Sequence, residues 1–332
     1  MLFAAALCYI IVMTNIKEKT EQIIEQASRV IIGKEKQLKY IVMAIFCEGH
    51  ILLDDLPGAG KTTTVKVISR ILDCSFARVQ FTPDLLPSDI IGTTVFNQKT
   101  GDFSTKHGPV MTNIFLADEI NRAIPRTQSA LLEAMEEAQI TIDSKTYKLP
   151  SPFIVMATQN PVEMESTFHL PVAQMDRFMI RLTLGYPDFD NEKEMLKIVG
   201  DEIPLDNIVP VIGSSEIMEL KRQIRDVYIS ESVLGYIVAL SEETRKNKLL
   251  RLPVSPRGSR ALYRAGKALA AMDGRNYVTP DDIKELAPYI LPHRIALSGE
   301  AKLSGKTERD VIDELLMTVA APGQKEEILR ER

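Results

Sequence analysis

The stretch HILLDDLPGAGKTTT, residues 50–64, constrains the fold more than any other part of the sequence. Residues 51–53 are an apolar run of strand length, and the proline and glycines within residues 57–60 cannot continue a strand. A helical pattern then runs from residue 61 to residue 72. A strand, a glycine-rich loop and a helix in this order predict a phosphate-binding loop, in which backbone N–H groups and the positive end of the helix face phosphate oxygens.

The side chains of this loop indicate a nucleoside triphosphate bound with Mg²⁺. Lys61 would neutralise the charge of the β- and γ-phosphates, and the Thr62 hydroxyl would ligate the metal ion. The strict pattern has glycine where this chain has Asp55; since aspartate tolerates positive φ, we expect the loop to close nevertheless. The alternative, a chance Gly-Lys-Thr turn, does not explain the flanking strand and helix. The predicted nucleotide-binding residues here are Pro57, Gly58, Ala59, Gly60, Lys61, Thr62 and Thr63.

Two later apolar runs end in polar residues suited to the same chemistry. The run at 114–117 is followed by Asp118 and Glu119, at the distance expected for the acidic strand of a P-loop enzyme. The aspartate, with Thr62, would hold Mg²⁺ and the glutamate would polarise water, whereas a buried strand needs neither charge for packing. The run at 153–158 precedes Asn160, which would hold the attacking water; by itself, Asn-Pro is an ordinary turn.

The rest of the chain divides into a nucleotide-binding core and a helical region. Short hairpins are predicted near residues 95–103 and 139–149, a last strand at 179–184, and an interdomain linker at 185–191. We expect an apolar N-terminal tail at 1–15, a core domain at 16–186 and a helical lid at 187–332. The helices predicted in the lid are 191–199, 214–226, 230–246, 256–273, 279–290 and 306–319.

Two further residues are candidates for contacts with the nucleotide. Ile32 lies in an apolar turn, residues 30–34, between two predicted helices, where it would floor an adenine pocket or belong to an ordinary helix–helix core. Arg257 lies in the first turn of a lid helix that begins with Ser255-Pro256. A cation there opposes the helix dipole, and therefore gains from a phosphate partner.

The first thirteen residues are uncharged and apolar, but they are too few to span a membrane and lack the features of a secretory signal. Two interpretations are open: a mis-assigned or disordered tail, with Met13 as the true start, or a segment that anchors the protein or docks a partner. Contact with a membrane is expected only in the second case. The polar helix predicted after Met13 is typical of a cytoplasmic protein.

Composition limits the remaining functions. The net charge is −5, no long block of one sign occurs and the hairpins are read as poor in aromatic residues, so nucleic-acid binding is not expected. The three cysteines and four histidines are scattered and match no disulfide framework or zinc motif. We therefore expect a reducing compartment and no metal ion other than the one that arrives with the nucleotide.

Several long blocks of sequence resemble one family. The blocks are RVQFTPDLLPSDIIG (78–92), LADEINRAIPRTQSALLEAMEE (116–137), ATQNPVE (157–163), LPVAQMDRF (170–178), SPRGSRAL (255–262) and GRNYVTPDDI (274–283). Together they are similar to the MoxR family of AAA+ ATPases, from about residue 16 to residue 297. The resemblance implies an α/β fold with a parallel five-stranded sheet, a C-terminal all-helical lid, a helix-2 insert at the first hairpin, and assembly into rings, usually hexamers.

The resemblance also implies roles for single residues. It makes Gly58 to Thr63 the Walker A loop, Asp118 and Glu119 the Walker B acids, Asn160 sensor 1, Arg177 the arginine finger that reaches the ATP of the neighbouring subunit, and Arg257 sensor 2. Arg122 and Arg126 are second candidates for a charge acting in trans, behind Arg177. The chain departs from the family at Val172 and Ser166, and these departures bear on the ring interface more than on ATP binding.

The function implied is ATP hydrolysis coupled to remodelling, maturation or activation of a client protein, often one with a von Willebrand factor A domain. One alternative is a nucleic-acid motor, because helicases share the two inserted hairpins. The other is a nucleotide switch that does not hydrolyse ATP, against which Glu119 and Arg177 argue.

Overall fold

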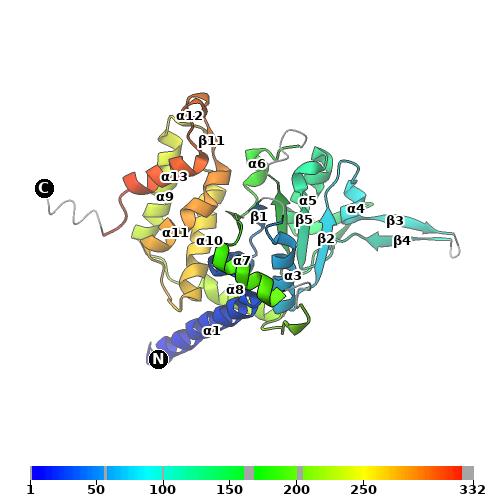
Figure 1. Ribbon diagram of the computed structural model, residues 1–332, viewed down its shortest axis with the longest axis horizontal. Coiled ribbons are helices and arrows are strands. Elements are labelled where there is room, and N and C mark those ends of the chain that lie inside the picture. The colour runs from blue at the N-terminus through cyan, green and yellow to red at the C-terminus, as the bar shows by residue number, and fades with distance from the viewer. Residues whose placement is uncertain (1, 56–57, 99–100, 161–167, 200–204, 324–332) are drawn as a thin grey trace. The chain divides into compact units, whose positions relative to one another are not determined.

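The computed structural model describes residues 2–55, 58–98, 101–160, 168–199 and 205–323. Its central element is the predicted five-stranded parallel sheet, with strand order β2-β5-β8-β1-β9 (Figure 1). The strands are β1 (Ile51–Asp54), β2 (Phe76–Gln80), β5 (Ile114–Asp118), β8 (Ile154–Gln159) and β9 (Ile180–Leu182).

The register of the sheet places the ends of the central strands side by side. Strand β5 pairs in parallel with β8 so that Ala117 lies opposite Ala157, and β8 pairs with β1 so that Thr158 lies opposite Leu53. Every residue of β5 and β8 is buried, as near-continuous apolar runs predict for strands covered on both faces. Polar residues at the carboxyl ends of these strands therefore meet at one edge of the sheet.

The helices of the nucleotide-binding part are α2 (Glu35–Phe46), α3 (Lys61–Ile71), α4 (Pro87–Ile91) and α5 (Pro125–Glu137), with a short 3₁₀ turn at Ile120–Arg122. They include α3, which was predicted from residue 61 to residue 72, and α4, which was not predicted. The first helix, α1, spans Leu2–Ser28, so helical structure runs through most of the segment predicted as a tail. Among the described residues, no helix combines the length and the apolar character needed to cross a membrane.

Both predicted hairpins are present. The first joins β3 (Gly92–Asn97) to β4 (Asp102–His107), and the second joins β6 (Gln139–Ile142) to β7 (Lys145–Lys148). The first hairpin extends away from the sheet (Figure 1). It carries Phe96 and Phe103 as a cross-strand pair with ring centroids 5.1 Å apart, and the two side chains are 50% and 74% exposed. The expectation of aromatic-poor hairpins is therefore wrong for this one.

The C-terminal region is helical, as predicted. Its helices are α7 (Phe189–Val199), α8 (Ser214–Arg225), α9 (Glu231–Lys246), α10 (Pro256–Met272), α11 (Pro280–Ile290), α12 (Gly299–Leu303) and α13 (Glu308–Thr318). A two-stranded ladder of β10 (Leu250–Leu252) and β11 (Ala296–Leu297), which the helical patterns did not predict, accompanies them. Ser230, Ser255, Thr279 and Thr307 cap helices with their hydroxyls, which explains why these helices begin where the sequence indicated.

The chain forms two compact units. One contains residues 21–170 and 182–218, and the other contains residues 1–20, 171–181 and 219–332. These bounds differ from a single boundary at residue 187, because residues 171–181 group with the C-terminal helices and residues 187–218 group with the sheet.

A buried cation organises the turn that contains Arg177. Arg294, 3% exposed, forms an ion pair with Asp176 and donates hydrogen bonds to the carbonyl oxygens of Asp176 (2.8 Å) and Phe178 (2.6 Å). The Nε2 atom of His293 lies 3.0 Å from the same Phe178 oxygen, so Nε2–H is the donor. The turn is thus fixed by the two side chains of a 3₁₀ turn, Pro292–Arg294.

We predict that His293 makes the folded chain sensitive to acid. Burial, and then the charge of Arg294, lower the pKa of His293 well below its ordinary value, so the folded state keeps the ring neutral. The unfolded state takes up a proton below about pH 6.5, and stability is therefore lost as the pH falls through that value, by up to about 1.4 kcal/mol per pH unit. Urea unfolding near pH 7 and about pH 5.5 should give a loss in free energy of unfolding that is about 1 kcal/mol smaller in His293→Gln. An equal loss in both proteins contradicts the prediction.

Candidate functional site

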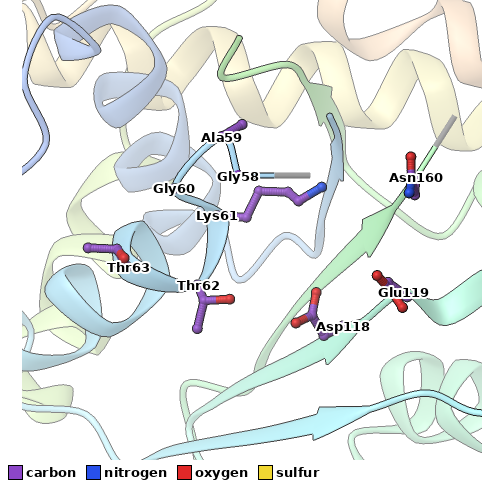
Figure 2. Close-up of a pocket in the computed structure, with 9 residues that line it drawn as sticks. All are labelled: Gly58, Ala59, Gly60, Lys61, Thr62, Thr63, Asp118, Glu119 and Asn160. Atoms are coloured by element: carbon purple, nitrogen blue, oxygen red, sulfur yellow. The ribbon is translucent and has the colours of Figure 1, made fainter. Parts of the chain in front are cut away.

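A pocket of about 380 Å³ lies at the carboxyl edge of the sheet, a size within the range of small-molecule sites. Figure 2 shows the side chains of Lys61, Asp118, Glu119 and Asn160 around one space. They come from the start of α3, the end of β5 and the end of β8, which are far apart in the sequence. The residues that line the pocket are Gly58, Ala59, Gly60, Lys61, Thr62, Thr63, Asp118, Glu119 and Asn160.

The glycines of the loop are required by backbone conformation. Gly58 and Gly60 have φ of 81° and 77°, in the left-handed region, and a Cβ atom at either position would meet no neighbour within 4 Å. Glycine is therefore favoured at these two positions by the backbone conformation, and not by a lack of room for a side chain. Gly60 is also the N-cap of α3, so that the helix directs its unpaired N–H groups into the pocket.

Asp55 stands at the first position of the loop for a different reason from the one expected. The φ angle of Asp55 is not positive. Its side chain is 3% exposed, and its two carboxylate oxygens accept hydrogen bonds from the backbone N–H groups of Leu184 (2.6 Å) and Gly185 (2.8 Å). The expectation that Asp55 is tolerated for its φ is replaced by a role for its carboxylate.

Asp118 is held from two sides. The Thr158 hydroxyl donates a hydrogen bond to its Oδ1 atom (2.6 Å), and Arg78 on the neighbouring strand β2 donates to its Oδ2 atom (2.7 and 3.0 Å). The Asp118 side chain is 11% exposed, so these charge-assisted bonds compensate its burial. The carboxylate is thereby fixed at the pocket wall.

Glu119 adopts an uncommon backbone conformation for a glutamate, with φ 55° and ψ 51°. Its N–H donates to the Thr158 hydroxyl (2.7 Å), and its carboxylate accepts from Gln80 (2.6 Å) and Arg122 (2.9 Å). Residues in such backbone regions persist only where their surroundings fix them, and they cluster at functional sites. The strained turn points the Glu119 side chain toward the pocket, beside that of Asp118 (Figure 2).

Sequence reasoning missed three residues that hold the acids: Arg78, Gln80 and Thr158. Arg78 and Gln80 alternate on one face of β2, and Gln80 lies opposite Asp118 in the register. Thr158 ends an apolar run on β8, the neighbour of β5. The alternating pattern of residues 76–80 was visible in the sequence. The order of the strands, which decides which side chains lie next to Asp118 and Glu119, was not visible.

The other predicted nucleotide contacts are placed as follows. Asn160 is 4% exposed and lines the pocket, beyond the end of β8. Ile32 is half-buried in the turn before α2 and is not among the pocket-lining residues. Pro57 and Ser166 lie outside the described residues.

The donor set also suits Mg²⁺, because Thr62 and Asp118 are hard oxygen donors on one pocket wall and phosphates and water would complete the shell. Across the described part of the chain, His, Cys, Asp and Glu form no group of three or more suited to a metal ion.

The arginines fall into two groups. Arg122 pairs with Glu119 of its own chain, and Arg126 is exposed on the first turn of α5. Arg177 and Arg257 both belong to the unit that contains the C-terminal helices. Ser255, the N-cap of the helix that carries Arg257, donates its hydroxyl to Asp176 (2.7 Å), the residue before Arg177. The turn that contains Arg177 and the start of the helix that carries Arg257 are therefore joined through the carboxylate of Asp176. Val172 lies in α6 (Val172–Met175), just before Arg177 in the sequence.

We predict that Thr158→Val damages both the fold and the site. The substitution keeps the shape but leaves the Glu119 N–H and one oxygen of Asp118 without their partner. The free energy of unfolding should therefore fall by about 2 kcal/mol. Denaturant unfolding measures the effect, and Thr158→Ser, which keeps the hydroxyl, is the matched control. A free energy of unfolding in Thr158→Val equal to that of the parent would show that these hydrogen bonds do not stabilise the fold.

Comparison with known proteins agrees with this geometry. The family model "ATPase family associated with various cellular activities (AAA)" matches residues 50–180, and the model "AAA lid domain" matches residues 242–315. The chain is 45% identical to the uncharacterized protein YeaC of Bacillus subtilis, covering 91% of this chain and 94% of that one. It is 37% identical to Chaperone MoxR1 of Mycobacterium tuberculosis, covering 91% and 82%. A crystal structure from Cytophaga hutchinsonii superposes with a TM-score of 0.88 at 38% identity, covering 97% and 99%. The P-loop, the acidic strand and the lid thus belong to one inherited arrangement, and the chain is a member of the MoxR family of AAA+ ATPases.

Proposed function

We propose that this chain hydrolyses ATP and uses the turnover to remodel, mature or activate a client protein. The observation that carries the proposal is the pocket itself, because it combines a P-loop lysine with two acids and an amide. One such residue alone is a common surface feature, whereas these four around one space are what phosphoryl transfer to water needs.

Each residue has a definite part in this reaction. Gly58 to Thr63 and the start of α3 surround the phosphates, and Lys61 neutralises their charge. Thr62 and Asp118 would hold Mg²⁺, which neutralises charge on the β- and γ-phosphates when bound. Glu119 accepts the proton of the attacking water, and Asn160 orients that water. Gln80 and Arg122, which contact the Glu119 carboxylate, must let it face the water for the reaction to occur.

We further propose that the chain works as a cytoplasmic ring, most simply a hexamer, in which Arg177 reaches the ATP of the neighbouring subunit. Arg257 would sense the γ-phosphate. The firm placement of the Arg177 turn by Arg294 supports a role that needs an accurately held cation. The client, in family members often a protein with a von Willebrand factor A domain, would meet the exposed hairpin β3–β4.

A nucleic-acid motor is the second candidate, favoured by the exposed Phe96–Phe103 pair, since aromatic faces on a hairpin stack bases. The net charge of −5 argues against it, because strand binding depends on neutralising phosphates. The third candidate, a switch without hydrolysis, leaves the ordered Glu119 turn without a purpose.

Substitutions of Lys61 and Glu119 should separate binding from turnover. Glu119→Gln keeps the shape and the neighbouring Mg²⁺ ligand but cannot take a proton, so we expect near-parent ATP affinity and a rate lower by roughly a hundredfold. Lys61→Ala should lose ATP binding. Calorimetric titration and a phosphate-release assay measure both effects. Parent-like hydrolysis by Glu119→Gln would exclude Glu119 as the base.

The aromatic pair of the hairpin should not be needed for hydrolysis and should not bind DNA. Phe96→Ser with Phe103→Ser should leave basal ATP hydrolysis within about twofold of the parent, because neither side chain lines the pocket. We expect neither the parent nor this variant to retain single- or double-stranded DNA in a filter-binding assay at roughly physiological salt. DNA retention by the parent that the double variant loses would assign the hairpin to nucleic acid.

Mixing two inactive variants tests the trans action of Arg177. Arg177→Ala subunits keep Glu119, and Glu119→Gln subunits keep Arg177, so each pure ring is nearly inactive. In a random equal mixture about one interface in four has both groups. The rate of ATP hydrolysis should therefore rise above that of either pure variant. If Arg177 serves its own site, activity stays at or below the mean of the two at every ratio, given independent proof of subunit exchange.

A further inference from the structure

The buried carboxylate of Asp55 joins the phosphate-binding loop to the end of the sheet. Its Oδ2 atom accepts from the N–H of Leu184 (2.6 Å) and its Oδ1 atom from the N–H of Gly185 (2.8 Å). Its own carbonyl oxygen accepts from Lys61 Nζ (2.7 Å). One residue thus contacts both the lysine of the P-loop and the chain that leaves β9.

These contacts do not have the character of an incidental surface interaction. Asp55 is 3% exposed, and burial raises the pKa of its carboxyl group above the ordinary value, although the two N–H bonds and the charge of Lys61 act to lower it. Burying a carboxylate is costly in free energy unless its oxygens are hydrogen-bonded. Both oxygens are committed to backbone donors, which fixes the main chain of Leu184 and Gly185 relative to the loop.

The segment fixed by Asp55 continues to the turn before α2. The Thr183 hydroxyl donates to the carbonyl oxygen of Asp54 (3.2 Å), and Lys34 Nζ donates to that of Tyr186 (2.9 Å). Asn191 packs so closely on Gly33 that a Cβ atom there would lie 2.4 Å from its amide nitrogen. Residues 183–191 therefore lie along both the start of the P-loop and the turn at residues 33–34.

We propose that Asp55 is a positioning residue for the nucleotide: its carboxylate holds the first residue of the P-loop against residues 184–185, so that Lys61 and the loop amides are presented in one fixed arrangement. The proposal rests on the nucleotide binding proposed above and goes beyond it, because it assigns a task to a side chain that the P-loop pattern does not use.

The proposal reverses the usual expectation for this loop. Glycine at position 55 would restore the strict P-loop pattern, yet it would leave the N–H groups of Leu184 and Gly185 without their acceptor, of which Leu184 is buried. The loop would then sample more arrangements before it closes on phosphate, and binding would bear that ordering cost. Asp118 and Glu119 do not touch Asp55, so the chemical step itself should be preserved.

The experiment compares Asp55→Gly and Asp55→Asn with the parent in the full-length chain. The dissociation constants of ATP and ADP with Mg²⁺ are measured by calorimetry, and KM and kcat by phosphate release. We expect the dissociation constant for ATP to rise at least about tenfold in Asp55→Gly and less in Asp55→Asn, whose amide oxygen still accepts one bond, with kcat within about twofold of the parent. Amide hydrogen exchange at residues 184–185 should become faster in the same order.

Matched controls and contrary outcomes keep the test sharp. Asp73→Gly makes the same change at an exposed position with φ 43°, where glycine is tolerated, and should leave affinity and exchange at residues 184–185 unchanged. A lower folded fraction with unaltered affinity of the folded protein would overturn the proposal, as would parent-like affinity in Asp55→Gly. Failure of the parent to bind ATP would instead refute nucleotide binding itself, and the role of Asp55 with it.

Discussion

The hydroxyl of Thr158 is the interaction on which the acidic half of the site depends. It donates to Asp118 and accepts from the N–H of Glu119, with distances of 2.6 and 2.7 Å. Because Thr158 is the penultimate residue of β8 and the acids lie at and just after the end of β5, the bonds form only if these two strands pair in parallel and in this register. The sheet is thus the scaffold of the site in a literal sense: a shift of one residue would turn Thr158 away from both acids.

Buried charges fix the other parts in the same manner. Asp55 binds two backbone N–H groups in the unit with the sheet, and the Arg294–Asp176 pair fixes the Arg177 turn in the unit with the C-terminal helices. A buried charge is costly unless every polar atom finds a partner, and this requirement leaves the surrounding chain few arrangements. Each unit thereby carries its functional residues on backbone that is held by charge-assisted hydrogen bonds.

Much of the fold was predictable because its signals are local. The run at residues 114–117, the glycines at 58 and 60, and the cap at Ser255 each specify an element without reference to distant residues. The ladder β10–β11 was not predictable, since its two short strands lie far apart in the chain and only tertiary packing pairs them. The aromatic pair on the first hairpin is local by contrast, because Phe96 and Phe103 both lie within the hairpin predicted near residues 95–103, and antiparallel pairing places them opposite each other.

The sequence by itself determined that a P-loop, an acidic strand and a lid occur in one chain, because spacing and side-chain type encode these elements within a few residues. Only the tertiary structure decided which side chains serve them. Asp55 was expected to be tolerated for its φ, yet its carboxylate binds residues 184–185, which follow it by about 130 positions. Thr158, Arg78 and Gln80 reach the acids through strand order alone. Long-range hydrogen bonds are chosen by how elements pack, and a linear pattern does not contain that information.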